Sequence, residues 1–106
     1  WIVPYKTLKM YPWINREYAK GMEGEMLIDC AVYGKPNGDL SMDYSEMLEK
    51  KTIELNGIKT LISRNHFTID DFWRIYDRKN YYEIKSKTDP NNMFMDLYEK
   101  FTPSNY

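Results

Sequence analysis

Alternating hydrophobic and polar positions predict three β-strands in this chain. The run from Trp1 to Lys6 is typical of a short strand, and Pro4 places it at a sheet edge because proline cannot donate a ladder hydrogen bond. Between Glu25 and Tyr33 both alternating faces are largely apolar, which predicts a central strand covered on both sides. Residues 58–64 alternate again and predict a third strand. Residues 7–25 lack such a period and indicate a long loop between the first two strands.

A helical period starts after the turn-rich segment 34–39. Asp43 is expected to cap the first helix, because Glu46 follows at the position that completes a capping box. Asn56 and Gly57 tolerate left-handed backbone, so they are expected to end this helix. The residues that share its apolar face are Tyr44, Met47, Leu48, Lys51 and Leu55.

The second helix is expected to begin at Thr68, with Asp71 in the third position after the cap. Phe67 before the cap and Phe72 after it can form a hydrophobic staple. A short helical segment over 80–87 follows. The predicted buried stripe of the second helix consists of Ile69, Phe72, Trp73 and Tyr76.

A last amphipathic helix is expected near the end of the chain. Asp89 would cap it, with Pro90 in the first position, where the missing N–H costs nothing. This helix and its tail, 89–106, are expected to pack back on the rest of the protein, and 1–88 to form the sheet with its helices. The order of elements predicts an α+β fold with a small, mostly antiparallel sheet covered by helices. The apolar positions of the last helix are Met93, Phe94, Leu97, Tyr98 and Phe101.

The composition fits one domain with a modest core. The chain has 106 residues, and aromatic residues make up 16% of them, so a few large rings can supply most of the buried area. A net charge of -1 argues against nucleic-acid binding, which needs a basic face. No apolar run approaches the ~20 residues of a membrane span. Because the chain opens on a strand-like run, we expect further sequence upstream.

Complete catalytic and metal-binding motifs are absent from the sequence. Cys30 is the only thiol and His66 the only imidazole, so neither an internal disulfide nor a cysteine zinc cluster can form. Asp70 and Asp71 stand at a helix start, where capping explains them better than metal ligation. Phosphate-loop, dinucleotide-binding and nucleophile-elbow motifs are all missing. We therefore assign no catalytic residue and no metal site.

Asp29 is the first candidate binding residue. It lies within the most apolar strand, where an ionised carboxylate needs a partner. A structural ion pair with Arg64 or Lys6 would provide that partner. The other interpretation places Asp29 on a ligand-facing surface of the sheet.

Two further groups stand out. The polar run from Ser63 to His66 ends a predicted strand, and strand ends commonly present binding groups, although solvation alone also explains such a run. Tyr81 and Tyr82 either line a pocket or fill the seam between helix and sheet, and we expect the seam.

Four separated segments and the helix over 94–101 are collinear with one known family. The segments are Trp1–Tyr5, Gly24–Pro36, Asp71–Asp77 and Tyr81–Lys85. They resemble the C-terminal end of the delta-24-sterol reductase family, which belongs to the FAD-binding PCMH-type oxidoreductases (the vanillyl-alcohol oxidase superfamily). None of them is a catalytic signature, so the specificity of the resemblance lies in their order and spacing along nearly the whole chain.

The resemblance implies a role beside a flavin. In that family an N-terminal domain binds FAD, and a later cap domain lays an antiparallel sheet over the flavin ring. Residues 1–88 would be the last part of the cap or substrate domain, and 89–106 would pack on the missing FAD-binding region. Hydride would pass between the reduced flavin and a carbon of a small apolar substrate. FAD would be bound mainly outside this chain, which would not be active alone.

The resemblance also implies where the intact protein lies in the cell and which residues lie near the substrate. The intact protein would be intracellular and attached to the endoplasmic reticulum membrane through an N-terminal segment that these residues do not include. The candidates on the substrate side are Asp29, Arg64, Asn65 and His66, with Tyr5 and Lys6 as neighbours on the strand over the flavin.

Two other interpretations remain open. In the first the chain is a non-enzymatic α+β module that binds a protein or peptide, and in the second it is a structural subunit of a larger assembly. The surroundings of Trp1, Trp13 and the apolar residues of 93–101 separate these interpretations. A free module should bury those side chains internally, whereas part of a larger protein should leave them on a broad apolar surface.

Overall fold

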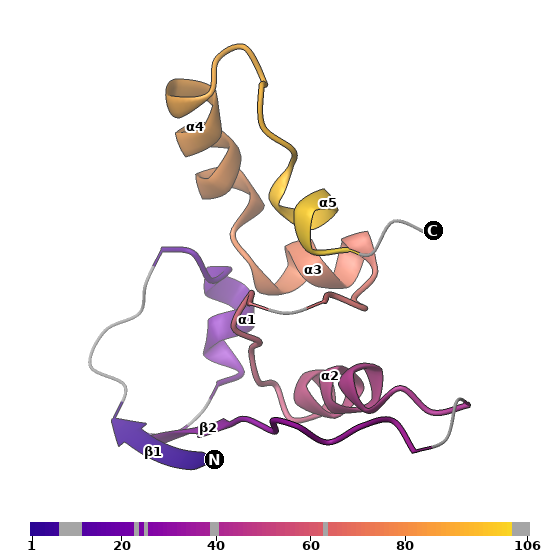
Figure 1. Cartoon of the computed structure of the whole chain (residues 1–106). Helices are drawn as coiled ribbons and strands as arrows, with labels where there is room; N and C mark the ends of the chain where they lie inside the picture. The colour runs from indigo at the N-terminus through magenta and orange to yellow at the C-terminus, as the bar shows by residue number, and fades with distance from the viewer. Residues whose placement is uncertain (7–11, 23, 25, 39–40, 63, 103–106) are drawn as a thin grey trace.

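The computed structural model describes residues 1–6, 12–22, 24, 26–38, 41–62 and 64–102, with the side chain of Tyr5 excepted. Their fold is α+β, as predicted, with one two-stranded antiparallel sheet and several helices (Figure 1). The elements in chain order are β1 (Ile2–Lys6), α1 (Arg16–Lys20), β2 (Met26–Cys30), α2 (Tyr44–Glu54), α3 (Ile69–Ile75), α4 (Arg78–Thr88) and α5 (Leu97–Phe101).

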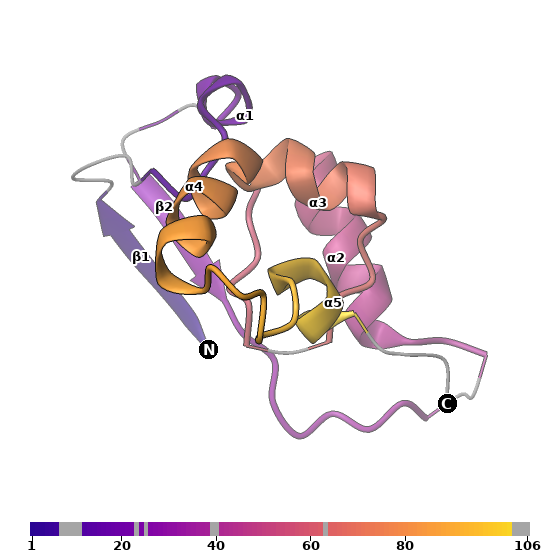
Figure 2. The ribbon, with the colours of Figure 1, turned by 90° about the horizontal axis from the view of Figure 1, so that it is seen from above.

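The molecule is flat and open. The β1–β2 hairpin and α2 lie on opposite sides of one layer, and α4 with the loop after it projects away from that layer (Figures 1 and 2). The molecule extends over 44 × 41 × 21 Å. Its radius of gyration is 15.4 Å, whereas a compact domain of this length is expected near ~13 Å. Much of the chain therefore does not pack around a common core.

The hairpin corrects the prediction of a covered central strand. β1 and β2 pair so that Ile2 stands opposite Cys30 and Lys6 opposite Met26. Among the described residues no other strand flanks β2. Met26 and Ile28 consequently remain 64% and 63% exposed. The edge position predicted for Pro4 is confirmed.

Residues 58–62 and 64 form no strand, so this part of the prediction is wrong, while Ser63 lies outside the described residues. Side chains rather than a neighbouring strand bond to the backbone there. The Tyr76 hydroxyl donates to the carbonyl of Lys59 at 2.5 Å, and the Lys59 ammonium donates to the carbonyl of Arg64. Burial raises the pKa of the Tyr76 hydroxyl well above its usual range.

The core is built around α3. Thr68 caps this helix as predicted, because its hydroxyl oxygen accepts a hydrogen bond from the amide of Asp71 at 3.1 Å. Ile69, assigned to the buried stripe, is half exposed, and Ile75 is fully buried instead. Buried residues form one contiguous cluster of Phe67, Phe72, Trp73, Ile75 and Tyr76.

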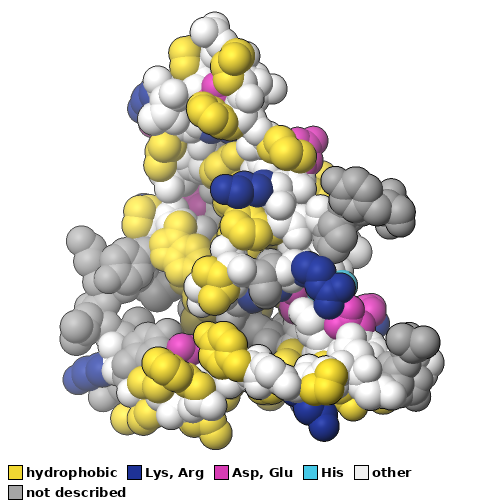
Figure 3. Space-filling model, viewed as in Figure 1, with side chains coloured by type: hydrophobic (Ala, Val, Ile, Leu, Met, Phe, Trp, Pro, Cys, Tyr) yellow, Lys and Arg dark blue, Asp and Glu magenta, His cyan; other side chains and the backbone are white. Residues whose placement is uncertain are grey.

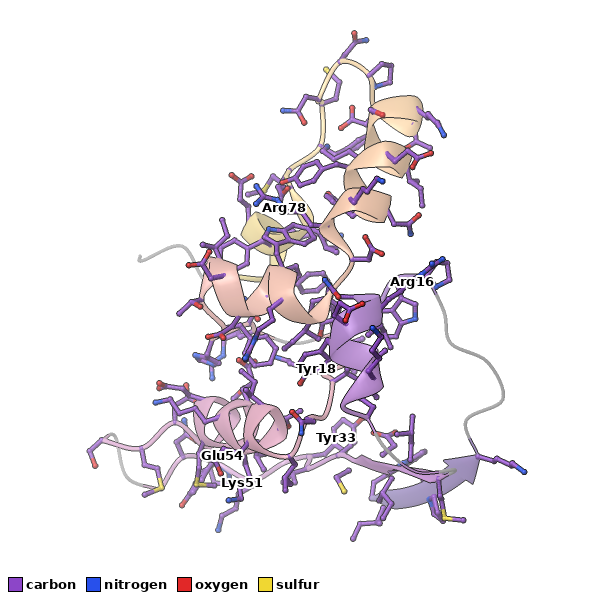
Figure 4. The ribbon with its side chains drawn as sticks, turned by 180° about the vertical axis from the view of Figure 1, so that it is seen from behind. Arg16, Tyr18, Tyr33, Lys51, Glu54 and Arg78 are labelled. Atoms are coloured by element: carbon purple, nitrogen blue, oxygen red, sulfur yellow. The ribbon has the colours of Figure 1, made fainter. Side chains whose placement is uncertain are left out.

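The predicted long loop between the strands contains α1, although residues 7–11, 23 and 25 lie outside the described part. The carboxamide oxygen of Asn15 caps α1 by accepting from the amide of Glu17 at 2.9 Å. Tyr18 then reaches from α1 toward the layer below (Figure 4), where its hydroxyl donates to the carbonyl of Gly57 at 2.7 Å. The loop prediction missed α1 because the helix is only five residues long and buries none of them.

α2 begins and ends where the sequence indicates. Asp43 caps it through the amides of Ser45 and Glu46. The Glu46 side chain pairs with Lys50 at 2.7 Å, in place of the return bond of a capping box. Asn56 takes the left-handed conformation, with φ of 52°, and ends the helix.

The predicted apolar face of α2 does not point into the molecule. Met47 and Leu48 are nearly half exposed, and Leu55 is 72% exposed. Glu49 is only 4% exposed and faces inward with Ile53, which packs against the core cluster. The inward side of α2 therefore consists of Glu49 and Ile53, whereas most of the predicted apolar face lies on the surface.

The C-terminal helix is shorter than predicted and does not start at Pro90. Asp89 ends α4, whose range includes the short helical segment predicted over 80–87. α5 begins after Asp96, which forms a capping box with Glu99. The Asp-x-x-Glu pattern over 96–99 is the sequence signature of such a box.

Candidate functional site

A corner of the molecule beside α2 brings together several charged groups that the sequence leaves apart. Glu49 of α2 is buried, and its carboxylate accepts from the Lys59 ammonium and from the amide of His66, the latter at 2.7 Å. The Lys59 ammonium also donates to the carbonyl of Arg64. One buried carboxylate thus holds both ends of the segment 59–66 against the helix.

Asp43 forms the outer part of this corner. One of its carboxylate oxygens caps α2, and the other lies 3.0 Å from Nη2 of Arg64 and 3.9 Å from Nε2 of His66. Partial burial acts to raise the pKa of Asp43. The hydrogen bonds from the amides of Ser45 and Glu46, together with the charge of Arg64, outweigh that effect and hold the pKa below its usual range.

His66 has a buried nitrogen atom that is not hydrogen-bonded. Its side chain is 18% exposed, and within the described part of the chain Nε2 has no hydrogen-bond partner. An unbonded buried nitrogen is unfavourable, and the Asp43 carboxylate at 3.9 Å is too distant for a direct bond. Nε2 of His66 is therefore the buried side-chain atom of the described corner that lacks a hydrogen-bond partner.

Asn65, the buried neighbour of His66, has a structural role in this fold. Its amide donates to the carbonyl of Phe101 at 2.7 Å, and its side-chain nitrogen donates to the hydroxyl of Thr102 at 3.1 Å. Its side-chain oxygen accepts from the amide of Phe67 at 3.3 Å. Asn65 consequently ties the end of α5 to this corner.

The structure divides the six candidate residues into two groups. Tyr5, Lys6 and Asp29 belong to the hairpin, on the side of the molecule opposite α2 (Figures 1 and 2). Asp29 is exposed, and Arg64 pairs with Asp43 instead of with it. Arg64 and Asn65 lie with His66 in the corner. The sequence lacked a signal for Asp43 and Glu49 as their partners, because capping explained the first and the second follows no binding pattern.

An open groove of about 470 Å³ lies on the other side of α3, between α4 and α5. Tyr82 lines it, whereas Tyr81 packs on Trp73 with ring centroids 5.3 Å apart. The prediction that both tyrosines fill a seam between helix and sheet is therefore wrong, because their rings contact residues of helices and not of the sheet. The other residues along the groove are Ile69, Lys85, Asn92, Met93, Phe94, Met95, Asp96, Tyr98 and Glu99.

The wall of the groove is a loop organised by Asp89. Its carboxylate accepts from the amides of Met93 and Phe94 at 2.7 and 3.1 Å, and lies 2.5 Å from the Lys85 ammonium. The hydrogen bond from Lys85 is the main reason why the pKa of Asp89 lies below its usual range. Asn92 adds a left-handed turn, with φ of 49°.

Replacing Asp89 by alanine is expected to loosen this loop without unfolding the core. Amide hydrogen exchange at Met93 and Phe94 should accelerate by about 10- to 100-fold, because two hydrogen bonds to a charged group are lost. Exchange in α3 should stay unchanged. The folded pKa of Asp89 is lowered, so its contribution is present above the ordinary carboxyl range and is lost as the pH falls through the folded pKa.

Glu83→Ala is the matched control, because Glu83 pairs with Lys87 on the exposed side of the same helix. If both variants accelerate exchange at Met93 equally, Asp89 does not organise the loop.

Metal binding has no support in the described part of the chain, where no three metal-ligating side chains gather. None of the described helices is long and apolar enough to cross a membrane.

Comparison with known proteins identifies a distant relationship. The chain is 28% identical to human delta(24)-sterol reductase over 102 residues, and 26% identical to the rat protein of that name over the same length. The match covers 94% of this chain and only 19% of each relative. No protein-family model matches the chain, and no solved structure does. The chain is thus related at a distance to the sterol reductases and spans about a fifth of their length.

Proposed function

We propose that these residues are the C-terminal part of a longer FAD-linked oxidoreductase of the PCMH type, similar to delta(24)-sterol reductase. In that protein residues 1–88 would belong to the cap or substrate domain, and 89–106 would pack on the FAD-binding region. The part described here would help to form the substrate side of the flavin site and would not be active alone. The relationship over 94% of the chain supports this proposal.

The observation that carries the proposal is the amount of apolar surface left uncovered. Trp1 is 74% exposed, Trp13 is 41% exposed, and the run 93–95 is 67–78% exposed. Leu97, Tyr98 and Phe101 of the same apolar set are partly buried within the fold. Hydrophobic side chains gather over the hairpin and along the projection of α4 (Figure 3). An independent module of this size would be expected to bury such residues. Their exposure fits a segment whose partner surface is another part of a larger protein.

The exposed face of α2 adds to this argument. Met47, Leu48 and Leu55 repeat at helical spacing, which is the pattern of a packed face, yet all three lie on the surface. Lys51 and Glu54 pair on the outside of the same helix (Figure 4). A helix with an apolar face is stabilised mainly by packing of that face, so α2 is expected to be covered in the intact protein.

The described residues do not fit the phosphates of FAD. A pyrophosphate is usually held at a free helix N-terminus or on a glycine-rich loop. Here the N-terminus of every described helix is occupied by its own side-chain cap, and three of these caps are aspartates, which would repel phosphate. The caps are Asn15, Asp43, Thr68, Asp77 and Asp96. The cofactor would therefore be held by residues outside this chain.

The contribution proposed for this chain is a wall around a small apolar substrate. Asp29, Tyr5 and Lys6 on the hairpin and Arg64, Asn65 and His66 in the corner remain its candidate substrate-side residues. Among these residues His66 has a polar atom, Nε2, that is not hydrogen-bonded within the described part of the chain, but this atom is buried, so polar contact with a substrate there would require the corner to open. Asn65 is the least suitable, because its side chain already bonds within the fold.

The intact mass and visible absorption of the protein purified from its natural source test this proposal. We expect a protein larger than 12.8 kDa that is yellow from bound flavin, and residues 1–106 expressed alone should be colourless. A colourless natural protein of 12.8 kDa would refute the proposal and favour the interaction module or the structural subunit.

A further inference from the structure

The two edges of the hairpin differ in their capacity to bind another strand. The amide of Ala31 donates to the carbonyl of Trp1 at 3.0 Å, so these two residues form a hydrogen-bonded pair. Because such pairs alternate along an antiparallel ladder, Val3–Asp29 is the next hydrogen-bonded pair. Pro4 and Ile28, one position beyond that pair, are opposite each other as a non-hydrogen-bonded pair, and their backbone groups point away from the hairpin.

Proline blunts the β1 edge. At the centre of β1 the residue whose backbone groups point outward is Pro4, which has no N–H to donate. The corresponding positions of β2 are Met26, Ile28 and Cys30, and all three have an N–H. Among the described residues, none bonds to the outward-facing amides or carbonyls of these three residues, and β2 has no second strand partner. The outer edge of β2 therefore has all of its backbone hydrogen-bond donors and acceptors, whereas the edge of β1 lacks a donor at Pro4.

One face of the hairpin is apolar and uncovered. Residues directly opposite each other point to the same face, so Ile2, Pro4, Met26 and Ile28 share one side with Cys30 and, at its end, Lys6. Ile2 is 74% exposed, and Met26 and Ile28 are each more than 60% exposed. A two-stranded hairpin is marginally stable in water, and three or more strands with an apolar face are usually needed.

We propose that the outer edge of β2 binds a third strand supplied by a part of the same polypeptide outside these 106 residues. A strand from elsewhere in the same polypeptide presupposes the longer protein of the proposed function, since this chain covers only 19% of the length of its relatives. The added strand would place apolar side chains at alternate positions beside Met26 and Ile28.

Charge complementarity specifies one position of the added strand. Asp29 is exposed on the opposite face of β2 and forms no ion pair among the described residues. A basic or hydroxyl side chain of the third strand beside Asp29 would offset this charge, because opposite charges on neighbouring strands stabilise a sheet. Asp29 would then pair within the sheet, and the substrate-side candidates on the hairpin would be reduced to Tyr5 and Lys6.

Amide hydrogen exchange on the longest natural form of the protein tests the proposal. The amides of Met26, Ile28 and Cys30 should exchange about 100-fold more slowly than in residues 1–106 expressed alone, because a paired strand must open before exchange. The amide of Ile2, on the blunted edge, should exchange rapidly in both samples. Rapid exchange at Ile28 in the longest natural form would overturn the proposal.

A proline pair supplies the matched variants. Ile28→Pro removes an outward N–H and leaves the bonds between β1 and β2 intact, and the hairpin already contains Pro4 directly opposite. Ile2→Pro removes an outward N–H and an exposed isoleucine from the other edge. We expect Ile28→Pro to abolish the slow exchange at Met26 and Cys30 in the longest natural form and Ile2→Pro to preserve it. Equal effects of the two variants would contradict the proposal.

Two further measurements separate the possible failures. Sedimentation shows whether a second copy occupies the edge: protection that appears only in a dimer, and falls on dilution, would overturn a strand from the same polypeptide. Flavin content is measured on the same sample. Slow exchange at Ile28 in a flavin-free monomer would support the third strand while refuting the flavoprotein, and rapid exchange in a yellow monomer would do the reverse.

Discussion

Truncation of Phe72 to alanine is expected to destabilise the fold by about 3–5 kcal/mol, enough to unfold much of a marginally stable chain. Phe72 is fully buried at the centre of the core cluster. Its ring lies 4.6 Å from that of Tyr76, 4.9 Å from that of Trp73 and 5.3 Å from that of Tyr98, measured between centroids. The cavity would therefore remove contacts within α3 and between α3 and α5. Urea unfolding followed by tryptophan fluorescence measures the effect.

Phe94→Ala is the matched control, because the same atoms are removed from a ring that is 75% exposed. In residues 1–106 alone this variant should change the unfolding free energy by no more than about 0.5 kcal/mol. If the two variants unfold at the same urea concentration, the core is not centred on Phe72. In the intact protein Phe94→Ala should become destabilising, because in the proposed longer protein another part of the polypeptide covers the loop that contains Phe94.

The second large effect is expected at Glu49. Glu49→Gln should destabilise the fold by about 3 kcal/mol, because it leaves the Lys59 ammonium without its carboxylate in a site where both side chains are mostly buried. The amide of His66 would keep an acceptor in the glutamine oxygen, so the loss reports mainly on the charge. Thermal and urea unfolding of the two proteins measure it.

Two variants make this test specific. Glu54→Gln breaks an ion pair with Lys51 that is exposed on both sides, and it should change stability little. The double variant Glu49→Gln with Lys59→Met should recover much of the lost stability, because the lysine charge is then no longer buried alone and the glutamine oxygen still accepts from the amide of His66. If Glu49→Gln and Glu54→Gln are equally mild, the corner does not depend on its buried ion pair.

The polar attachment of α2 has a consequence for the whole molecule. Helices usually face the core with apolar residues, yet here Glu49 faces inward and Leu55 faces solvent. The arrangement leaves apolar surface on α2, on the hairpin and on the loop 93–95. Residues 1–106 alone are consequently expected to associate at high concentration, whereas the intact protein would cover these surfaces.

Local signals in the sequence placed several elements correctly because they depend on near neighbours. The caps at Asp43 and Thr68 and the turn at Asn56 involve residues within four positions of each other, and the structure confirms them. Pro4 marked an edge strand for the same reason, since a missing N–H acts locally. The α+β class followed from the order of such elements.

Partners distant in the chain decided the remainder. Residues 58–64 alternate like a strand, but hydroxyls from Tyr18 and Tyr76 bond to the carbonyls of Gly57 and Lys59, and within the described part of the chain no strand lies alongside. The helix predicted from Pro90 gave way to a loop because the Asp89 carboxylate bonds to the amides of 93 and 94. The six candidate site residues separated into the hairpin and the corner.

Periodicity shows that a face is apolar, but it does not show what covers that face. For α3 the cover is within the chain, so Phe72 and Tyr76 became core. For α2 and β2 the same kind of pattern led to surface, because the described part of the chain has nothing to pack there. Alternation, caps and turns therefore determined β1, β2, α2, α3 and α4 and their approximate limits. The tertiary structure alone decided which apolar faces meet, since burial depends on residues far away in the sequence and, we infer, on residues beyond these 106.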